Sequence, residues 1–141
     1  MCIFCGIIRG DLPASIVYEN NHVLAFLDIQ PFTPGHVLII PKIHVSSFVE
    51  LSKEEAGHLI RAGQLIDQAL RESSLRCEGV TIFLSDGKAA NQEVDHVHLH
   101  VFPRFEGDGF EMRLEGKGRR RPGRSQLDEV AEKITDAFER L

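Results

Sequence analysis

The sequence predicts an α+β domain in which five short strands and two amphipathic helices surround one core. Three observations lead to this class. Short apolar runs lie between turn-forming residues, as strands do. Two longer stretches repeat apolar residues at the spacing of a helix. One further run alternates histidine with apolar residues, which is the period of a strand.

Four of the strands are runs of apolar and β-branched residues, at 16–19, 23–27, 37–40 and 80–84. The dipeptide Asn20-Asn21 separates the first two runs, so we expect them to form a hairpin. The third run is apolar throughout and lies between Gly35 and Pro41, which predicts a buried central strand.

Each helix is marked by a capping residue. Ser52 precedes Glu55 by three residues, the spacing of a capping box, and the helix that follows is expected to end near residues 73–74. The second helix is expected to begin after Ser125. Their apolar faces consist of Ala56, Leu59, Ile60, Leu65, Ile66, Ala69 and Leu70, and of Leu127, Val130, Ala131, Ile134, Ala137, Phe138 and Leu141.

The fifth strand, at 97–102, belongs to a run in which three histidines alternate with apolar residues from His96 to Val101. On a strand the three imidazoles would share one face, about 6–7 Å apart, above an apolar face. We weigh three interpretations: a histidine-rich surface strand, a metal site, and nucleophilic catalysis by the central imidazole.

Composition sets the bounds of function. The chain has 141 residues, of which 43% are hydrophobic and 26% charged, as in an ordinary globular domain. A net charge of −5 argues against general nucleic-acid binding. We find no apolar run long enough for a membrane span and no signal peptide, so we expect a cytoplasmic protein with reduced cysteines.

Two segments resemble a known family. Residues 35–42 read Gly-His-Val-Leu-Ile-Ile-Pro-Lys within the run from Asp28 to His44, and the histidine run ends in two apolar residues at Phe102. With the opening Cys-Ile-Phe-Cys-Gly-Ile-Ile, these segments resemble the bacterial, Hint-like branch of the histidine triad (HIT) family over roughly the first 110 residues.

This resemblance implies a HIT-like fold, a five-stranded antiparallel sheet that homodimerisation extends. We expect residues 1–110 to form the domain core. Residues 111–141 would supply a basic loop and a C-terminal helix packed on the same domain. The arginine-rich run at 119–124 is expected to be a solvated loop.

The resemblance also implies an enzyme that cleaves the α-phosphate linkage of a purine nucleotide derivative, as a phosphoramidase or hydrolase. His98 would attack phosphorus and form a covalent nucleotidyl-histidine. His100 and His36 would donate to phosphate oxygens, and Gln92 would contact the phosphate or the leaving group. Glu93 stands where many members carry Ser or Thr, which separates this chain from their pattern.

By the same resemblance, the carboxylate of Asp28 would accept hydrogen bonds from the ribose. The other residues assigned to substrate binding are an apolar base pocket and two loop residues: Ile3, Phe4, Ile7, Phe26 and Ile29, then Ser85 and Lys88.

Cys2 and Cys5 have the spacing of half a structural zinc site. His44 is a natural third ligand and His96 a candidate fourth, an arrangement that similar bacterial members use. The zinc would be structural, with no cofactor needed for the chemistry. The alternative is that both cysteines are free and pack as small apolar residues.

Three other functions stay open at this point. They are a dinucleoside polyphosphate hydrolase with the same intermediate, a metallohydrolase in which the three triad histidines share one catalytic zinc, and a nucleotide-binding regulatory module. We expect a nucleotide or nucleotide conjugate and a second copy of the chain as partners, with no membrane and no specific nucleic acid.

Overall fold

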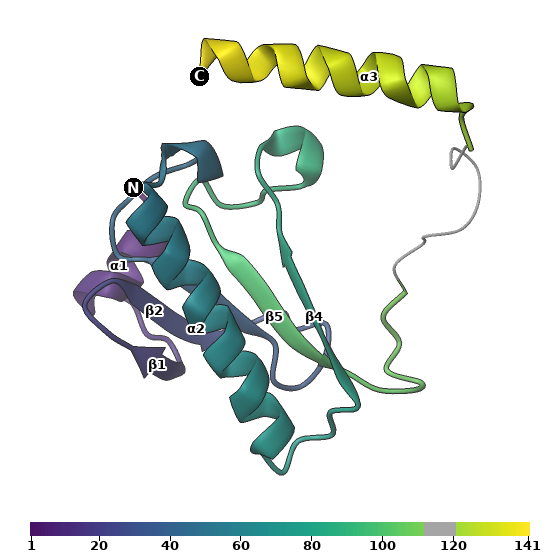
Figure 1. The fold of residues 1–141 in the computed structure, drawn as a ribbon. Helices are drawn as coiled ribbons and strands as arrows, with labels where there is room; N and C mark the ends of the chain where they lie inside the picture. The colour runs from purple at the N-terminus through teal and green to yellow at the C-terminus, as the bar shows by residue number, and fades with distance from the viewer. Residues whose placement is uncertain (112–120) are drawn as a thin grey trace. The chain divides into compact units, whose positions relative to one another are not determined.

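The computed structural model describes residues 1–111 and 121–141. These residues divide into two units, Met1–Phe110 and Glu111–Leu141, and we describe each by itself. The first unit contains the sheet and two α-helices, and the second contains one α-helix (Figure 1). Within the described ranges, no helix is long and apolar enough to cross a membrane.

The sheet has five antiparallel strands in the order β1-β2-β3-β5-β4 among the described residues, which confirms the predicted fold class. Its strands are β1 (Ile16–Glu19), β2 (Val23–Leu27), β3 (Val37–Pro41), β4 (Gly79–Leu84) and β5 (Leu99–Arg104). The β1–β2 hairpin turns at Asn20, whose Oδ1 accepts from the backbone of His22 and Val23. Strand β3 is buried throughout, as expected for a central strand.

Helix α2 (Lys53–Glu72) covers one face of the sheet (Figure 1). It begins after Ser52, whose hydroxyl accepts from the Glu55 backbone N–H as the capping box predicted. Leu59 and Ile66 pack on strands β3 and β5 in the main core. Gly63 lets the helix approach closely, because a Cβ there would lie 2.9 Å from Leu99 Cδ2.

The opposite face carries a second apolar cluster formed by Phe4, Leu24, Phe26, Leu38 and Ile40. Phe4 comes from α1 (Ile3–Arg9), a helix that the two-helix prediction did not include. At seven residues α1 is about two turns, too short for a helical period to stand out in the sequence. It ends at Gly10, which adopts the left-handed conformation at φ 82°.

One prediction about the histidine run is wrong in its extent. Strand β5 begins at Leu99, so His96 and His98 precede it and only His100 lies on the strand. Pairing with β3 stops at Ile39, and beyond it Pro41 has no N–H to offer a ladder. The backbone N–H groups of His96 and Val97 bond instead to Val94 and Val45. The three imidazoles therefore do not all share one face of a strand.

The second unit contains α3 (Arg124–Ala137) and a short 3-10 turn at Phe138–Arg140. Two further 3-10 turns, at Phe48–Glu50 and Lys88–Ala90, lie in the first unit. The expected N-cap, Ser125, lies inside α3, and Gly123 caps it instead, its N–H donating to Gln126 Oε1. Residues 119 and 120 of the arginine-rich run lie outside the described residues. The packing of residues 111–141 on the core and the homodimer stay predictions.

A candidate histidine site beside a thiol–imidazole cluster

Two of the cavities in the first unit meet at the histidine run. One, of about 220 Å³, is lined mainly by apolar side chains, which come from α1, β2, β3 and the loops beside them. The other, of about 300 Å³, is lined by a more polar set that includes Phe32, Phe83, Ser85 and Asn91. Five residues line both: Asp28, Gln30, Glu93, His98 and His100. The two imidazoles therefore stand between an apolar and a polar compartment.

The backbone sets which nitrogen of His98 carries the proton. Its Nδ1 lies 2.8 Å from the carbonyl oxygen of His96, and because that oxygen only accepts, Nδ1 must donate. In the neutral ring Nε2 then keeps a free lone pair. The ring is buried, and the Phe4 ring contacts it edge-on with centroids 5.3 Å apart. His98 thus has the tautomer of a nucleophile.

His100 has the opposite tautomer, through a chain of hydrogen bonds. The backbone N–H of Phe32 donates to His36 Nδ1 at 3.1 Å, so the proton of neutral His36 is on Nε2. This Nε2–H lies 2.9 Å from His100 Nδ1 and donates to it. The proton of His100 is then on its own Nε2. One imidazole of the pair offers a lone pair and the other an N–H.

Asp28, His36 and His100 also place ligand atoms within 4.8 Å of one another, as a metal site requires. The hydrogen bonds argue against an ion there. Since the Phe32 N–H occupies the lone pair at His36 Nδ1, His36 Nε2 must keep its proton and has no lone pair for a metal. Asp28 Oδ2 lies 3.7 Å from this nitrogen. We therefore interpret the group as a chain of hydrogen bonds that fixes which nitrogen of each imidazole carries the proton.

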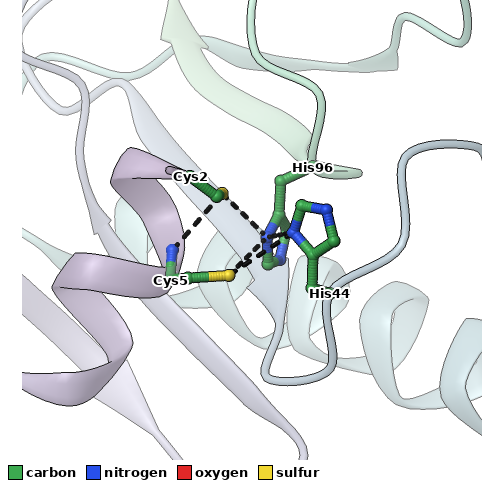
Figure 2. Close-up of side chains that lie close together, drawn as sticks. All are labelled: Cys2, Cys5, His44 and His96. Carbon is green, nitrogen blue, oxygen red and sulfur yellow. Dashed lines mark hydrogen bonds between the residues drawn. The ribbon is translucent and has the colours of Figure 1, made fainter.

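A second group of side chains converges at the N-terminal end of α1. Figure 2 shows that Cys2, Cys5, His44 and His96 point toward one another. His96 Nδ1 lies 3.5 Å from Cys2 Sγ, 3.7 Å from Cys5 Sγ and 3.2 Å from His44 Nδ1. Cys5 Sγ lies 3.4 Å from His44 Nδ1.

These distances match the edges of a tetrahedral zinc site. With Zn–S of about 2.3 Å and Zn–N of about 2.05 Å, tetrahedral geometry gives S–N edges of about 3.6 Å and an N–N edge of about 3.3 Å. His96 Nε2 donates to the Pro41 carbonyl at 2.9 Å, which leaves Nδ1 as the ligand atom and supplies a typical outer-shell partner. The cluster is therefore compatible with zinc.

Comparison with known proteins agrees with these observations. Residues 9–107 match the family model of the HIT domain. The chain belongs to the HIT family. An uncharacterized HIT-like protein of Methanocaldococcus jannaschii is 47% identical over 109 residues, which are 77% of this chain and 83% of the relative.

Two further HIT relatives bear on the chemistry. The adenosine 5′-monophosphoramidase of Schizosaccharomyces pombe is 38% identical over 103 residues, covering 73% of this chain and 74% of the relative. The crystal structure of a zinc-bound histidine triad family protein from Mycobacterium smegmatis has a TM-score of 0.75 and 41% identity. That match covers 92% of this chain and 96% of the other.

The HIT structure brings most of the predicted nucleoside-binding residues together. The apolar cavity is lined by Ile3, Phe4, Phe26, Asp28 and Ile29. Ile7 packs in the apolar cluster under it and does not line it.

Of the two predicted loop residues, only one lines a cavity. Ser85 lines the polar cavity, whereas Lys88 lines neither of the two. The side-chain amide of Gln92 forms its hydrogen bonds with backbone groups: Oε1 accepts from Gly87 N–H, and Nε2 donates to the Ser46 and Val94 carbonyls. Gln92 therefore ties the loop together and does not line either compartment.

Sequence reasoning missed Phe32 and Phe83, which line the polar cavity of the HIT domain. The Phe83 ring stacks on His100 with centroids 4.3 Å apart, and the Phe32 ring stacks on His36 at 5.0 Å. Neither residue belongs to a recognisable motif. An aromatic residue in a strand or loop most often reflects core packing, so its presence alone does not indicate a site.

Burial keeps His36 and His100 neutral. It lowers the pKa of His36, and together with the nearby His98 and His36 it lowers the pKa of His100 to about 3. Burial also lowers the pKa of His96. Desolvation disfavours the imidazolium form, so the tautomers assigned above to His36 and His100 hold at neutral pH.

The low pKa of His100 predicts acid destabilisation. The unfolded chain takes up a proton near pH 6.5 and the folded chain only near pH 3, so the free energy of unfolding falls as pH drops through this window. Between pH 7 and 5 the expected loss from His100 is about 2 kcal/mol. Urea denaturation at both pH values should show a smaller loss for His100→Asn. Equal losses would mean that His100 titrates normally in the folded protein.

Proposed function

We propose that this HIT protein hydrolyses the α-phosphate linkage of a purine nucleotide derivative through a nucleotidyl intermediate on His98. The observation that carries the proposal is the pair of opposite tautomers at the meeting point of two cavities. A nucleophile needs the lone pair of His98 Nε2, and a phosphate that gains charge needs the N–H of His100 Nε2. The relative named as an adenosine 5′-monophosphoramidase supports the same chemistry.

In the first step His98 Nε2 attacks the α-phosphorus. A nitrogen–phosphorus bond forms, the bond from phosphorus to the leaving group breaks, and the leaving group takes up a proton from solvent. The Nδ1–H bond to the His96 carbonyl stabilises the cationic ring. In the second step water attacks phosphorus, the nitrogen–phosphorus bond breaks, the proton lost by the water passes to solvent, and the nucleoside monophosphate is released.

We assign a different part of the substrate to each of the two cavities. The apolar cavity of about 220 Å³ suits the base, with the Asp28 carboxylate available to the ribose hydroxyls. The polar cavity of about 300 Å³ receives the leaving group on the other side of His98. Apolar contact to a base gives little discrimination among bases, so purine preference rests on the family resemblance.

We also propose that Cys2, Cys5, His44 and His96 hold a structural zinc ion. The edge distances of the cluster and the zinc-bound Mycobacterium smegmatis neighbour support this. When bound, zinc would join three separate segments of the chain. The placement also disfavours a catalytic zinc shared by all three triad histidines, because His96 turns toward the cysteines while His98 Nδ1 is spent on a carbonyl.

A substrate panel tests the proposed function. Adenosine 5′-phosphoramidates, diadenosine polyphosphates and nucleotide sugars are each assayed with the wild-type protein. We expect kcat/KM for a phosphoramidate to exceed the others by more than about tenfold, which corresponds to about 1.4 kcal/mol in the barrier. Turnover of none of these compounds, with AMP still bound, would instead favour a nucleotide-binding regulatory module.

Glu93 is expected to influence which leaving group is accepted. It lines both cavities, and among the described residues neither lining includes Lys or Arg. A carboxylate about 5 Å from an anionic leaving group costs roughly 0.8 kcal/mol even at the dielectric constant of water. Glu93→Gln should therefore raise kcat/KM for diadenosine polyphosphates about fourfold relative to phosphoramidates. The exposed Glu54→Gln serves as the matched control, and an unchanged ratio in Glu93→Gln would show that the carboxylate faces away.

A further inference from the structure

The N-terminal segment, residues 1–14, forms one wall of the apolar cavity. Four of its residues line that cavity: Ile3, Phe4, Pro13 and Ala14. Across the described part of the chain, every hydrogen-bond contact from this segment to a later residue involves Cys2 or Cys5. Apolar packing of Phe4, Ile7 and Ile8 supplies the rest of the attachment. The polar attachment of this wall thus runs entirely through the thiol–imidazole cluster.

His96 links the same cluster to the nucleophile. Its Nδ1 faces both sulfur atoms, its Nε2 donates to Pro41 at the end of β3, and its carbonyl accepts from His98 Nδ1. Phe4, placed between the two cysteines in sequence, contacts the His96 and His98 rings edge-on at centroid distances of 5.9 and 5.3 Å. Cavity wall, cluster and nucleophile are therefore in direct contact.

We propose that metal occupancy of the Cys2–Cys5–His44–His96 cluster is coupled to nucleotide binding in the apolar cavity, so that each raises the affinity for the other. This inference rests on the proposed function. An ion held by both cysteines fixes Ile3 and Phe4 between them as a preformed wall. Without the ion, apolar packing and the weaker thiol–imidazole hydrogen bonds hold the segment less firmly, and nucleotide binding has to order it at a cost in free energy. Thermodynamic linkage makes the coupling reciprocal.

The test measures zinc affinity by equilibrium competition with a chromophoric chelator, with and without AMP, on the full-length protein. We expect AMP to raise zinc affinity about tenfold, within the usual range for coupled sites. Calorimetry should give the same factor between the AMP affinities of zinc-loaded and zinc-free protein. Ile3→Ala keeps all four ligands but trims the wall, so its factor should be smaller. Cys77→Ser removes a cysteine outside the cluster and should keep the factor.

The AMP dependence separates local coupling from global unfolding. A zinc-free protein that stays folded still binds AMP weakly, so the effect on zinc affinity reaches a plateau. An effect that keeps rising in proportion to AMP concentration would mean that zinc-free protein unfolds, and would overturn the inference. AMP binding with unchanged zinc affinity would also overturn it while leaving the proposed function intact. If AMP does not bind the zinc-loaded protein at all, both proposals fail.

Discussion

Replacing His98 with alanine is expected to lower the turnover of an adenosine 5′-phosphoramidate by about 10⁴-fold or more, since removal of a covalent nucleophile has effects of this order. The structure gives the reason: His98 Nε2 carries the free lone pair between the two cavities. Wild-type protein quenched during turnover should carry labelled nucleotide that acid releases, and His98→Ala should carry none.

His22→Ala is the matched control for this experiment. His22 is an exposed histidine in the turn after β1, outside both cavities, so its loss should leave turnover and labelling unchanged. AMP binding by His98→Ala, followed by calorimetry, would show that the cavity is still formed. Wild-type turnover without a trapped adduct, retained in His98→Ala, would contradict the covalent mechanism and favour a metal-activated water.

Removing Cys5, one of the four proposed zinc ligands, should have the largest effect on stability. At a free zinc concentration about a thousand times its dissociation constant, binding stabilises the folded state by about 4 kcal/mol. For a domain of this size the expected fall in Tm is roughly 10–20 °C for Cys5→Ser, and a strong chelator should have a similar effect on the wild-type protein. Differential scanning calorimetry with zinc analysis by mass spectrometry measures both changes.

Cys77→Ser is the control for the loss of Cys5. Cys77 is partly buried, and its thiol donates to the Gly79 carbonyl, away from the cluster. Its replacement should leave zinc content at one ion per chain and shift Tm by much less. Zinc-free wild-type protein with an unchanged Tm would contradict a structural role for the cluster, and the two cysteines would then be packing residues.

Local patterns predicted most of the strands and helices of this HIT domain. The β1–β2 hairpin and the capped start of α2 depend on interactions between residues close in sequence, and the burial of β3 is marked by a run that is apolar throughout, so all three can be inferred from the sequence. Helix α1 could not, because two turns are too few for a period. The start of β5 also could not, because it depends on where pairing with β3 ends.

Some features of the candidate site could likewise be inferred from the sequence, whereas others depend on the tertiary structure. The sequence by itself determined which residue types are present: two cysteines at zinc spacing, alternating histidines and an acid before a Gly-His motif. Only the tertiary structure decided what each ring does. His96 turns to the cysteines, the His96 carbonyl orients His98, and His36 orders the proton on His100. An imidazole has two equivalent-looking nitrogens, and the partner that selects between them is brought in by folding.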